Sequence, residues 1–265
     1  MQPTLFLSHG SPLQALPDSH AGPVWRAFAA GLPRPNAALV VSAHWESASP
    51  LVSGNAGSET VHDFGGFPAP LYSLRYPAPP AADHAARVVD LLRTAGMTAT
   101  ADSRRGLDHG AWVPLRWMYP AADLPIVQLS VQTALGPAQH LQLGQALAGL
   151  PRENILVIGS GHATHNLREA FAARTNPAAL RYVDEFADWL HAALVAGDHE
   201  TLLDYRRRAP GAARAHPTEE HLLPLFVALG AAGHAARASR WFEGREGPAL
   251  ALDSWRFDPI GTDTI

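Results

Sequence analysis

The residues of this chain best suited to do chemistry are histidines that follow strand-like segments. His9 ends LFLSH, His44 ends ALVVSAH, and His162 and His165 follow ILVIGSG. His221 lies in HPTEEHLLPL, near the start of a predicted helix. In an open α/β sheet, ligands bind in the crevice beyond the carboxyl ends of the strands. Imidazoles that converge there would hold a metal ion.

The segment HATHN carries two of these histidines directly after a glycine-rich strand end, GSG. His165 precedes a predicted helix start at Asn166, where an imidazole could reach into a crevice and transfer protons near neutral pH. The alternative is that His162 or His165 only completes the helix cap. Histidines on predicted helix surfaces or loops are assigned structural roles: His20, His84, His140, His191, His199 and His234.

The segment HPTEEH offers several possible ligands. Thr218 is a suitable N-cap for a helix over 216–233 and would place His221 at the third helical position. The positive end of a helix disfavours imidazolium, and neutral imidazole is the form that binds metal. His216 is a rival ligand. Glu219 or Glu220 could supply a carboxylate or simply complement the helix dipole.

Two further histidines each stand beside an acid in a glycine-flanked loop, as His62-Asp63 and Asp108-His109. Adjacent residues rarely hydrogen-bond productively to each other, so neither pair is identified as a catalytic dyad. Ser11, in SHGSP, lacks the GxSxG context of a serine nucleophile, and that signal is weak.

Composition narrows the class of protein. The chain has 265 residues and a net charge of −4, which argues against a nucleic-acid or anionic-membrane partner. No apolar run approaches the roughly 20 residues that span a bilayer, and the N-terminus does not resemble a signal peptide. We therefore expect a soluble cytoplasmic protein.

Two residue types are missing. The chain contains no cysteine, which excludes disulfides, iron–sulfur clusters and thiol nucleophiles. All twenty basic residues are arginine, which excludes Schiff-base enzymes and the P-loop lysine. Fourteen histidines make imidazole the leading candidate for catalysis.

The pattern of strands and helices predicts an α/β fold: a single layered domain over 1–265, with a central mixed or mostly parallel sheet and helices on both faces. Between strands and helices, the aromatic segment 46–79 is too long for a simple linker and is expected to be functional or disordered. The predicted strands are 4–9, 37–45, 125–131 and 154–161, with a strand–turn–strand tail from Ser239; the predicted helices are 22–32, 80–97, 137–149, one from Asn166, 177–196 and 216–233.

Seven ordered motifs resemble the 4,5-DOPA extradiol dioxygenase family, within the class III extradiol ring-cleavage superfamily. The resemblance covers about residues 4 to 255, nearly the whole chain. It is carried by SHGSP (8–12), SAHW (42–45), HDFGGFP (62–68) with LYxxxYPAP (71–79), GLDHGAW (106–112), YPxADxPxVQLSV (119–131), GSGHATHNLR (159–168) and PTEEHLLPL (217–225).

The resemblance implies a mononuclear non-haem metal site held by His9, His44 and His221. Fe(II) is expected for activity, and Zn(II) is possible in the isolated protein. His165 matches the acid–base histidine, which in some relatives is a fourth metal ligand, and His109 matches a second active-site histidine. The implied reaction inserts O₂ into a catechol such as DOPA and gives a ring-opened semialdehyde, with His165 first as base and then as acid.

The resemblance also suggests how the substrate is held. Its implied substrate-binding residues are His62, Phe64, Tyr72 and His162. The loop 62–76, which also contains Phe67 and Tyr76, would wall the aromatic ring; alternatively, its aromatic residues only pack the loop against the protein. His162 replaces an asparagine found in relatives and could alter substrate preference.

Two other functions use the same residues. The imidazoles could bind zinc and activate water in a hydrolase. The pocket could also belong to a binding protein without catalysis, although the intact set of histidines argues against this. The sequence leaves open which catechol is the substrate and how many copies of the chain associate.

Overall fold

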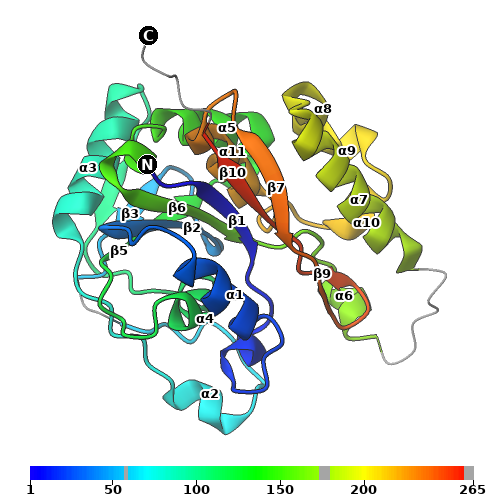
Figure 1. Ribbon diagram of the computed structural model, residues 1–265, viewed down its shortest axis with the longest axis horizontal. Coiled ribbons are helices and arrows are strands. Elements are labelled where there is room, and N and C mark those ends of the chain that lie inside the picture. Colours follow the sequence, from blue (N-terminus) through cyan, green and yellow to red (C-terminus); the bar gives the residue numbers. More distant parts are fainter. Residues whose placement is uncertain (57–58, 173–179, 260–265) are drawn as a thin grey trace.

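A mixed eight-stranded sheet forms the centre of the protein in a computed structural model, which describes residues 1–56, 59–172 and 180–259 (Figure 1). Its strand order is β4-β3-β5-β2-β6-β1-β10-β7. The strands are β1 Thr4–Ser8, β2 Ala37–Glu46, β3 Leu51–Ser53, β4 Thr100–Asp102, β5 Ile126–Val131, β6 Ile155–Gly161, β7 Arg237–Phe242 and β10 Ser254–Asp258, and a separate ribbon pairs β8 Arg245–Glu246 with β9 Leu250–Ala251.

Four adjacent parallel strands, β5, β2, β6 and β1, make up the middle of this sheet. Strand β10 runs antiparallel to β1, and β3 runs antiparallel to β5, so the sheet is mixed as predicted. Parallel strands are buried on both faces and therefore read as continuous apolar runs. Because their carboxyl ends share one edge, residues that follow β1, β2 and β6 come together there.

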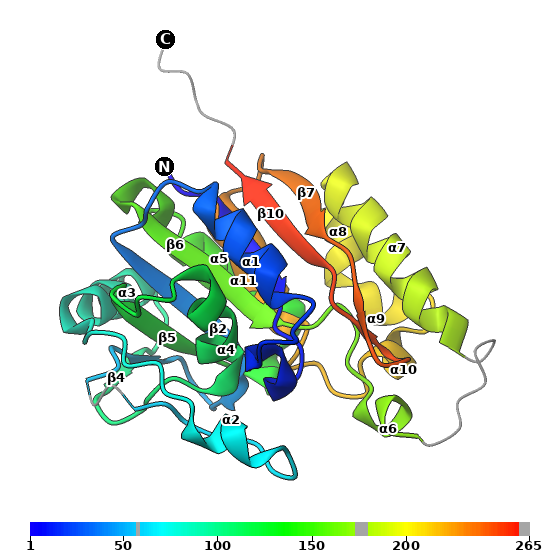
Figure 2. The ribbon, with the colours of Figure 1, turned by 60° about the horizontal axis from the view of Figure 1, so that its bottom comes forward.

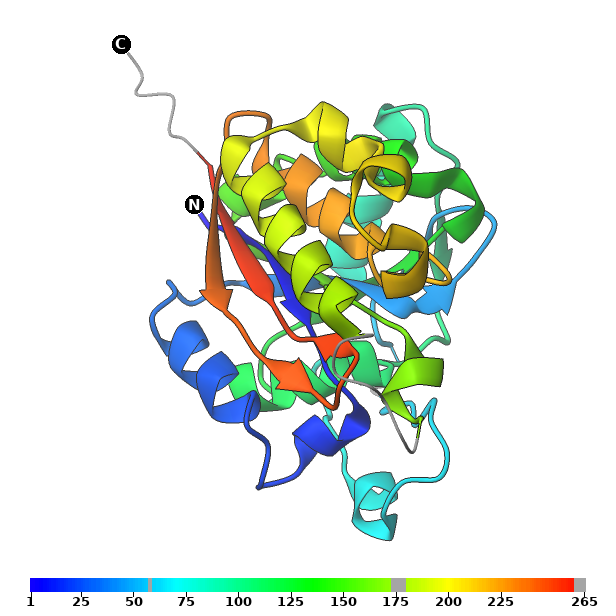
Figure 3. The ribbon, with the colours of Figure 1, turned by 90° about the vertical axis from the view of Figure 1, so that its right-hand side faces the viewer.

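Helices cover both faces of the sheet. Figures 2 and 3 show α1 and α4 on one face, with α5, α7 and α11 on the other. The described helices are α1 Gly22–Ala30, α2 Ala69–Ser73, α3 Ala82–Thr94, α4 His109–Met118, α5 Gly136–Ala146, α6 Leu167–Ala170, α7 Arg181–Ala196, α8 His199–Leu203, α9 Tyr205–Arg208, α10 Ala212–Ala215 and α11 Leu223–Ala232, with short 3₁₀ turns at Pro12–Ala15, Thr133–Leu135 and Leu150–Glu153.

Side chains alternate between the two faces along each strand. On β1, Leu5 and Leu7 belong to the core beneath α1 and α4, whereas Phe6 belongs to the core beneath α7 and α11. This alternation follows from the two-residue period of a strand. The predicted α/β class, with a mixed sheet and helices on both faces, is confirmed.

One predicted helix begins later than expected. Helix α11 starts at Leu223, with Pro224 in its first turn, and not after Thr218. The hydroxyl of Thr218 donates to Glu220 Oε1 at 2.9 Å instead of capping the helix. The placement of His221 in the first helical turn is therefore wrong, because residues 217–222 form turns that precede the helix.

Other boundaries differ in smaller ways. The long segment 46–79 contains the short strand β3 and the short helix α2, and β4 was not predicted. Asn166 caps α6 as expected, by accepting from the Glu169 N–H at 3.1 Å. Helix α7, predicted over 177–196, spans Arg181–Ala196, and residues 177–179 of the predicted range lie outside the described residues. The single-domain organisation over 1–265 stays a prediction.

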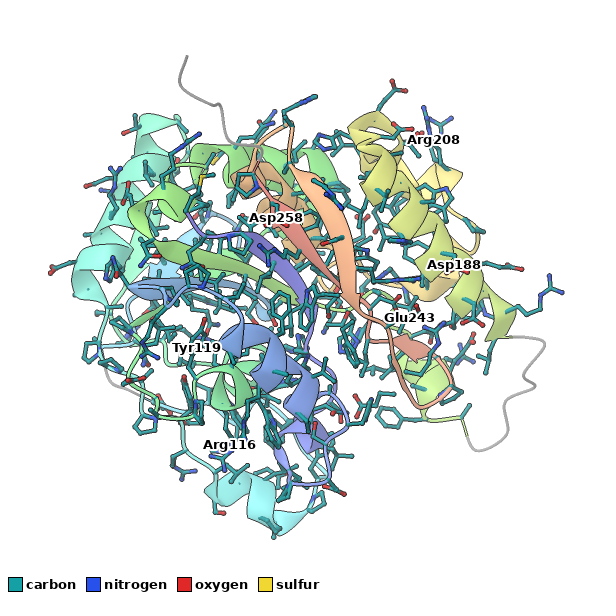
Figure 4. All side chains as sticks on the ribbon, in the orientation of Figure 1. Arg116, Tyr119, Asp188, Arg208, Glu243 and Asp258 are labelled. Atoms are coloured by element: carbon teal, nitrogen blue, oxygen red, sulfur yellow. The ribbon has the colours of Figure 1, made fainter. Side chains whose placement is uncertain are left out.

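The β8–β9 ribbon is tied to helix α7 and to the edge of the sheet by Arg240. The guanidinium of Arg240 lies 2.9 Å from the carboxylate of Glu243, which precedes β8, and 2.9 Å from that of the buried Asp253, which follows β9. It lies 3.7 Å from the carboxylate of Asp188 on α7. Figure 4 shows Asp188 on α7 and Glu243 beyond β7. These contacts fix the ribbon beside the carboxyl edge of the sheet.

Among the described residues no helix is both long and apolar enough to cross a membrane.

Candidate metal centre

A pocket of about 800 Å³ opens at the carboxyl edge of the parallel strands. His9 lies directly after β1, His44 near the end of β2, and His162 directly after β6. His165 precedes α6 and His221 precedes α11. All five side chains line the pocket, together with His109 at the start of α4. The structure thus brings together imidazoles that are far apart in the sequence.

Three of these imidazoles place one ring nitrogen each in a very small volume. His44 Nε2 lies 3.0 Å from His9 Nε2 and 3.3 Å from His221 Nε2. Metal–nitrogen bonds of about 2.0–2.1 Å place neighbouring ligand nitrogens about 3 Å apart. The ligand atoms of His9, His44 and His221 therefore have the spacing of a three-histidine metal site.

The hydrogen bonds of His9 identify its tautomer. Its Nδ1 lies 2.9 Å from Ser160 Oγ, and that hydroxyl donates its own proton to the carbonyl of Gly110. Ser160 must therefore accept from His9 Nδ1–H. This leaves His9 Nε2 unprotonated, with its lone pair directed at the other two histidines, as a metal ligand requires.

Carboxylates orient the other two rings. His221 Nδ1 donates to Glu220 Oε1 at 2.9 Å, which leaves Nε2 bare. His44 Nδ1 lies 3.6 Å from Asp63 Oδ2, so the proton is favoured on that side of the ring as well. All three rings thus turn an unprotonated nitrogen towards one point, and these residues fit a bound divalent metal.

Burial keeps these imidazoles neutral. It is the largest cause that lowers the pKa of His9, His44 and His221 well below the usual value, and neighbouring histidines lower it further. The neutral ring is the form that binds metal. The helix dipole expected to act on His221 is not needed, because desolvation has the same effect.

The segment Gly161–His162 allows the His221 turn to approach the sheet. The N–H of His162 donates to the carbonyl of His221 at 2.8 Å. A β-carbon at Gly161 would lie 2.0 Å from that carbonyl oxygen, so only glycine fits this position. The sequence motif GSGH is therefore required for the close approach of backbone at the site.

Asp63 links His109 to the three candidate ligands, because its carboxylate contacts both His109 and His44. The N–H of His109 donates to Asp63 Oδ1 at 3.0 Å, and His109 Nδ1 lies 3.0 Å from the same oxygen in a less well aligned ion-pair contact. Burial raises the pKa of Asp63, but the hydrogen bonds and charge of His109 outweigh burial and lower it to about 2. The ring centroid of His109 lies 3.9 Å from that of His44. Asp63 was noted in the sequence only as a neighbour of His62.

His165 lies beside the three ligand atoms rather than among them. Its ring stacks on that of His221, with centroids 3.4 Å apart and planes 13° apart. Burial lowers the pKa of His165 to about 2. His162, only 2% exposed, has its ring centroid 5.2 Å from that of His165, and its Nδ1 has no hydrogen-bond partner among the described residues.

The predicted substrate-binding residues divide into two pairs. Phe64 and His162 line the pocket, whereas His62 and Tyr72 do not. The ring centroid of His62 lies 5.7 Å and that of Tyr72 5.3 Å from the centroid of Phe64, so both rings pack against Phe64. His62 Nε2 forms a hydrogen bond with the carbonyl of Leu74 at 3.1 Å.

Two other candidates lie away from the ligand atoms. His216 is fully buried and donates from Nε2 to the carbonyl of Ala163 at 2.9 Å, so it does not replace His221. Tyr76 is buried and donates to the carbonyl of Tyr119 at 3.0 Å. Both residues have structural contacts that the sequence pattern did not indicate.

Comparison with known proteins supplies the family. The chain is 42% identical to a 4,5-DOPA dioxygenase extradiol of Beta vulgaris over 259 residues, which cover 96% of each chain. It is 39% identical to the protein of that name from Escherichia coli K12, covering 86% of this chain and 84% of the relative. A solved structure of an uncharacterized Escherichia coli K12 protein superposes with a TM-score of 0.80 and 34% identity, over 98% of this chain and 100% of that one.

A family model described as the catalytic LigB subunit of aromatic ring-opening dioxygenase matches residues 3–245. This match spans the parallel strands of the middle of the sheet, the six histidines that line the pocket and the turn that carries His221. The resemblance inferred from the sequence motifs is confirmed. The chain belongs to the LigB family of aromatic ring-opening dioxygenases.

Proposed function

We propose that this extradiol dioxygenase opens the ring of a catechol such as DOPA with O₂ and releases a semialdehyde. One observation carries the proposal. The Nε2 atoms of His9, His44 and His221 meet in the pocket at the carboxyl edge of the parallel strands. The names of the relatives from Beta vulgaris and Escherichia coli support a catechol substrate.

We propose Fe(II) as the active metal, held by Nε2 of His9, His44 and His221. Three neutral imidazoles are also a good zinc site, so the isolated protein can carry zinc. When bound, iron supplies open coordination positions for the two catechol oxygens and for O₂. The three side chains would hold the ion from the protein side and leave it accessible from the pocket that they line.

Proton transfer is proposed for His165. Its neutral ring is held against His221 and faces the pocket, so a ring nitrogen can accept the proton of a catechol hydroxyl. The same nitrogen can return that proton to oxygen when the O–O bond breaks. The stacking contact keeps His165 outside the group of ligand atoms, which favours this role over that of a fourth ligand.

His109 and the aromatic wall are proposed to position the reactants. His109 is anchored through its backbone by Asp63 and can hydrogen-bond to substrate or O₂ from the side of His44. Phe64 and Phe67 line the pocket and pack 5.5 Å apart between centroids. They give the catechol ring an apolar wall and exclude water from the reacting atoms.

The proposal is tested by loading the protein with Fe(II) without oxygen and then adding air and a panel of catechols. We expect O₂ uptake that matches the appearance of a yellow semialdehyde, and no uptake by the zinc-loaded protein. Ester hydrolysis by the zinc form without any O₂ uptake would instead identify a zinc hydrolase. Tight binding of catechols with no turnover across the panel would identify a binding protein.

A further inference from the structure

Apart from a bound metal ion, the permanently charged side chains that line the described part of the pocket are all carboxylates. Among the described residues the lining includes four carboxylates, those of Glu46, Asp63, Glu220 and Glu246, and no arginine. Since the chain has no lysine, the described part of the lining offers an anionic group no permanently charged side chain of positive sign. A cleft lined by one sign of charge concentrates ligands of the opposite sign.

The half-buried Arg105 lies close to His44 and does not change this. Arg105 donates to the carbonyl of His44 at 3.2 Å but lies behind the pocket lining. Its charge is paired with the fully buried Asp108 at 3.0 Å. Arg105 therefore holds the backbone of His44 in place, and its charge is not available to a charged substituent of the catechol.

Three of the four carboxylates already accept hydrogen bonds from other residues of the protein. Asp63 accepts from His109, Glu220 accepts from His221, and Glu246 accepts from both the N–H and the hydroxyl of Ser11. Glu46 is different: it is exposed, and within the described part of the chain only its Oε2 has a partner, the hydroxyl of Thr133 at 2.5 Å.

Glu46 is also well placed to meet a substituent of the catechol. It lies two residues after His44 in β2, and both side chains line the pocket. Strand β2 is irregular between Val41 and Glu46, and both His44 and Glu46 still reach the same pocket. A catechol ring held beside His44 therefore presents its substituent to a pocket that Glu46 also lines.

Deeper in the pocket the lining is imidazole, and His162 there is 98% buried. At the mouth, Leu13, Leu167 and Phe171 are 41%, 44% and 74% exposed. In the described part of the chain, the pocket therefore combines buried imidazoles and an apolar rim with carboxylates, and its lining contains no arginine to bind an anion.

We propose that, given the ring-cleaving function above, this pocket selects catechols whose side chain ends in an ammonium over those that end in a carboxylate. Glu46 is the specificity-determining residue. Its free carboxylate oxygen attracts an ammonium and repels a carboxylate, while the other pocket acids strengthen the same preference. DOPA carries both charges and falls between the two classes.

Three catechols whose rings carry the same two-carbon chain isolate this effect, because the chain ends in an ammonium in dopamine, in hydrogen in 4-ethylcatechol and in a carboxylate in 3,4-dihydroxyphenylpropionate. Their ring oxygens are the same, so the metal treats them alike and only the terminal group differs. Partly exposed charge contacts are each worth about two- to fivefold in binding. We expect dopamine to bind at least about tenfold more tightly than the propionate, with 4-ethylcatechol between them, and added salt to reduce this ratio.

The experiment measures dissociation constants of the metal-loaded protein under nitrogen, followed by kcat/KM in air. Glu46→Gln should lower the dopamine-to-propionate ratio about threefold or more. Glu200→Gln is the matched control, because Glu200 is an exposed residue of α8 that pairs with Arg208 and does not line the pocket. It should leave the ratio unchanged.

The outcomes separate this inference from the proposed function. Equal or tighter binding of the propionate by the wild-type protein overturns the charge preference. A ratio that Glu46→Gln and Glu200→Gln leave equally unchanged overturns the assignment of Glu46. Selective binding of dopamine without ring opening of any catechol supports the charge preference while contradicting the proposed reaction.

Discussion

Replacement of Gly161 by alanine tests how the metal site depends on the backbone. The α-carbon of Gly161 faces the carbonyl of His221, and an added β-carbon would lie 2.0 Å from that oxygen and 3.0 Å from its carbon. Ordinary contacts of a β-carbon begin near 3.4 Å. The His221 segment must therefore move by more than 1 Å, because both sides of the contact are backbone or fixed to it.

This displacement is large compared with what a metal site tolerates. Ligand distances must be correct to about 0.2 Å, so His221 Nε2 would leave its position. The hydrogen bond from the His162 N–H to the His221 carbonyl, 2.8 Å long, would also be strained. We expect the variant to lose about 1–3 kcal/mol of unfolding free energy and at least about 100-fold in metal affinity.

The assay combines urea unfolding of the metal-free protein with metal titration followed by calorimetry. Gly149→Ala is the control, because a β-carbon there would meet only Glu153 Oε1 at 3.9 Å. It should bind metal like the wild type. A Gly161→Ala protein with wild-type stability and metal affinity would refute the claim that this contact sets the position of His221.

Three further substitutions test individual residues. His165→Ala should keep its metal but lose ring opening, because its ring stacks beside the ligand atoms; loss of metal would instead make it a fourth ligand. Ser160→Ala should weaken metal binding about 10–100-fold, because His9 Nδ1 loses its acceptor, and unchanged affinity would contradict the assigned tautomer. Burial lowers the pKa of His216 to about 4, so the unfolded chain takes up its proton first as pH falls below about 6.5. The wild type should therefore lose about 2 kcal/mol more unfolding free energy between pH 7 and pH 5 than His216→Gln, which keeps a donor for the Ala163 carbonyl; parallel curves in urea unfolding would refute this.

The positions of His9 and His44 could be predicted because they depend on local pattern. Each follows a continuous apolar run, and such runs form buried parallel strands whose carboxyl ends share an edge. His221 was placed in the right region for the wrong reason. The Pro-Thr-Glu-Glu sequence resembles a helix start, but Thr218 bonds to a side chain and the helix begins at Leu223.

The partners of these histidines could not be predicted, because they come from distant parts of the chain. Ser160 bonds both to His9 and to the carbonyl of Gly110, and Asp63 bonds to His109 across a separation of 46 residues. No local spacing encodes such contacts. Similarly, His62 and Tyr72 share a loop with Phe64, yet only the fold shows that Phe64 faces the pocket.

Metal content of single-alanine variants tests the central claim most directly. After loading and dialysis, the wild type should retain one metal ion per chain, and His9→Ala, His44→Ala and His221→Ala should retain little. His20→Ala, at an exposed site outside the pocket lining, should bind like the wild type. Full retention of metal by all three pocket variants would contradict the assignment of these nitrogens as the ligands.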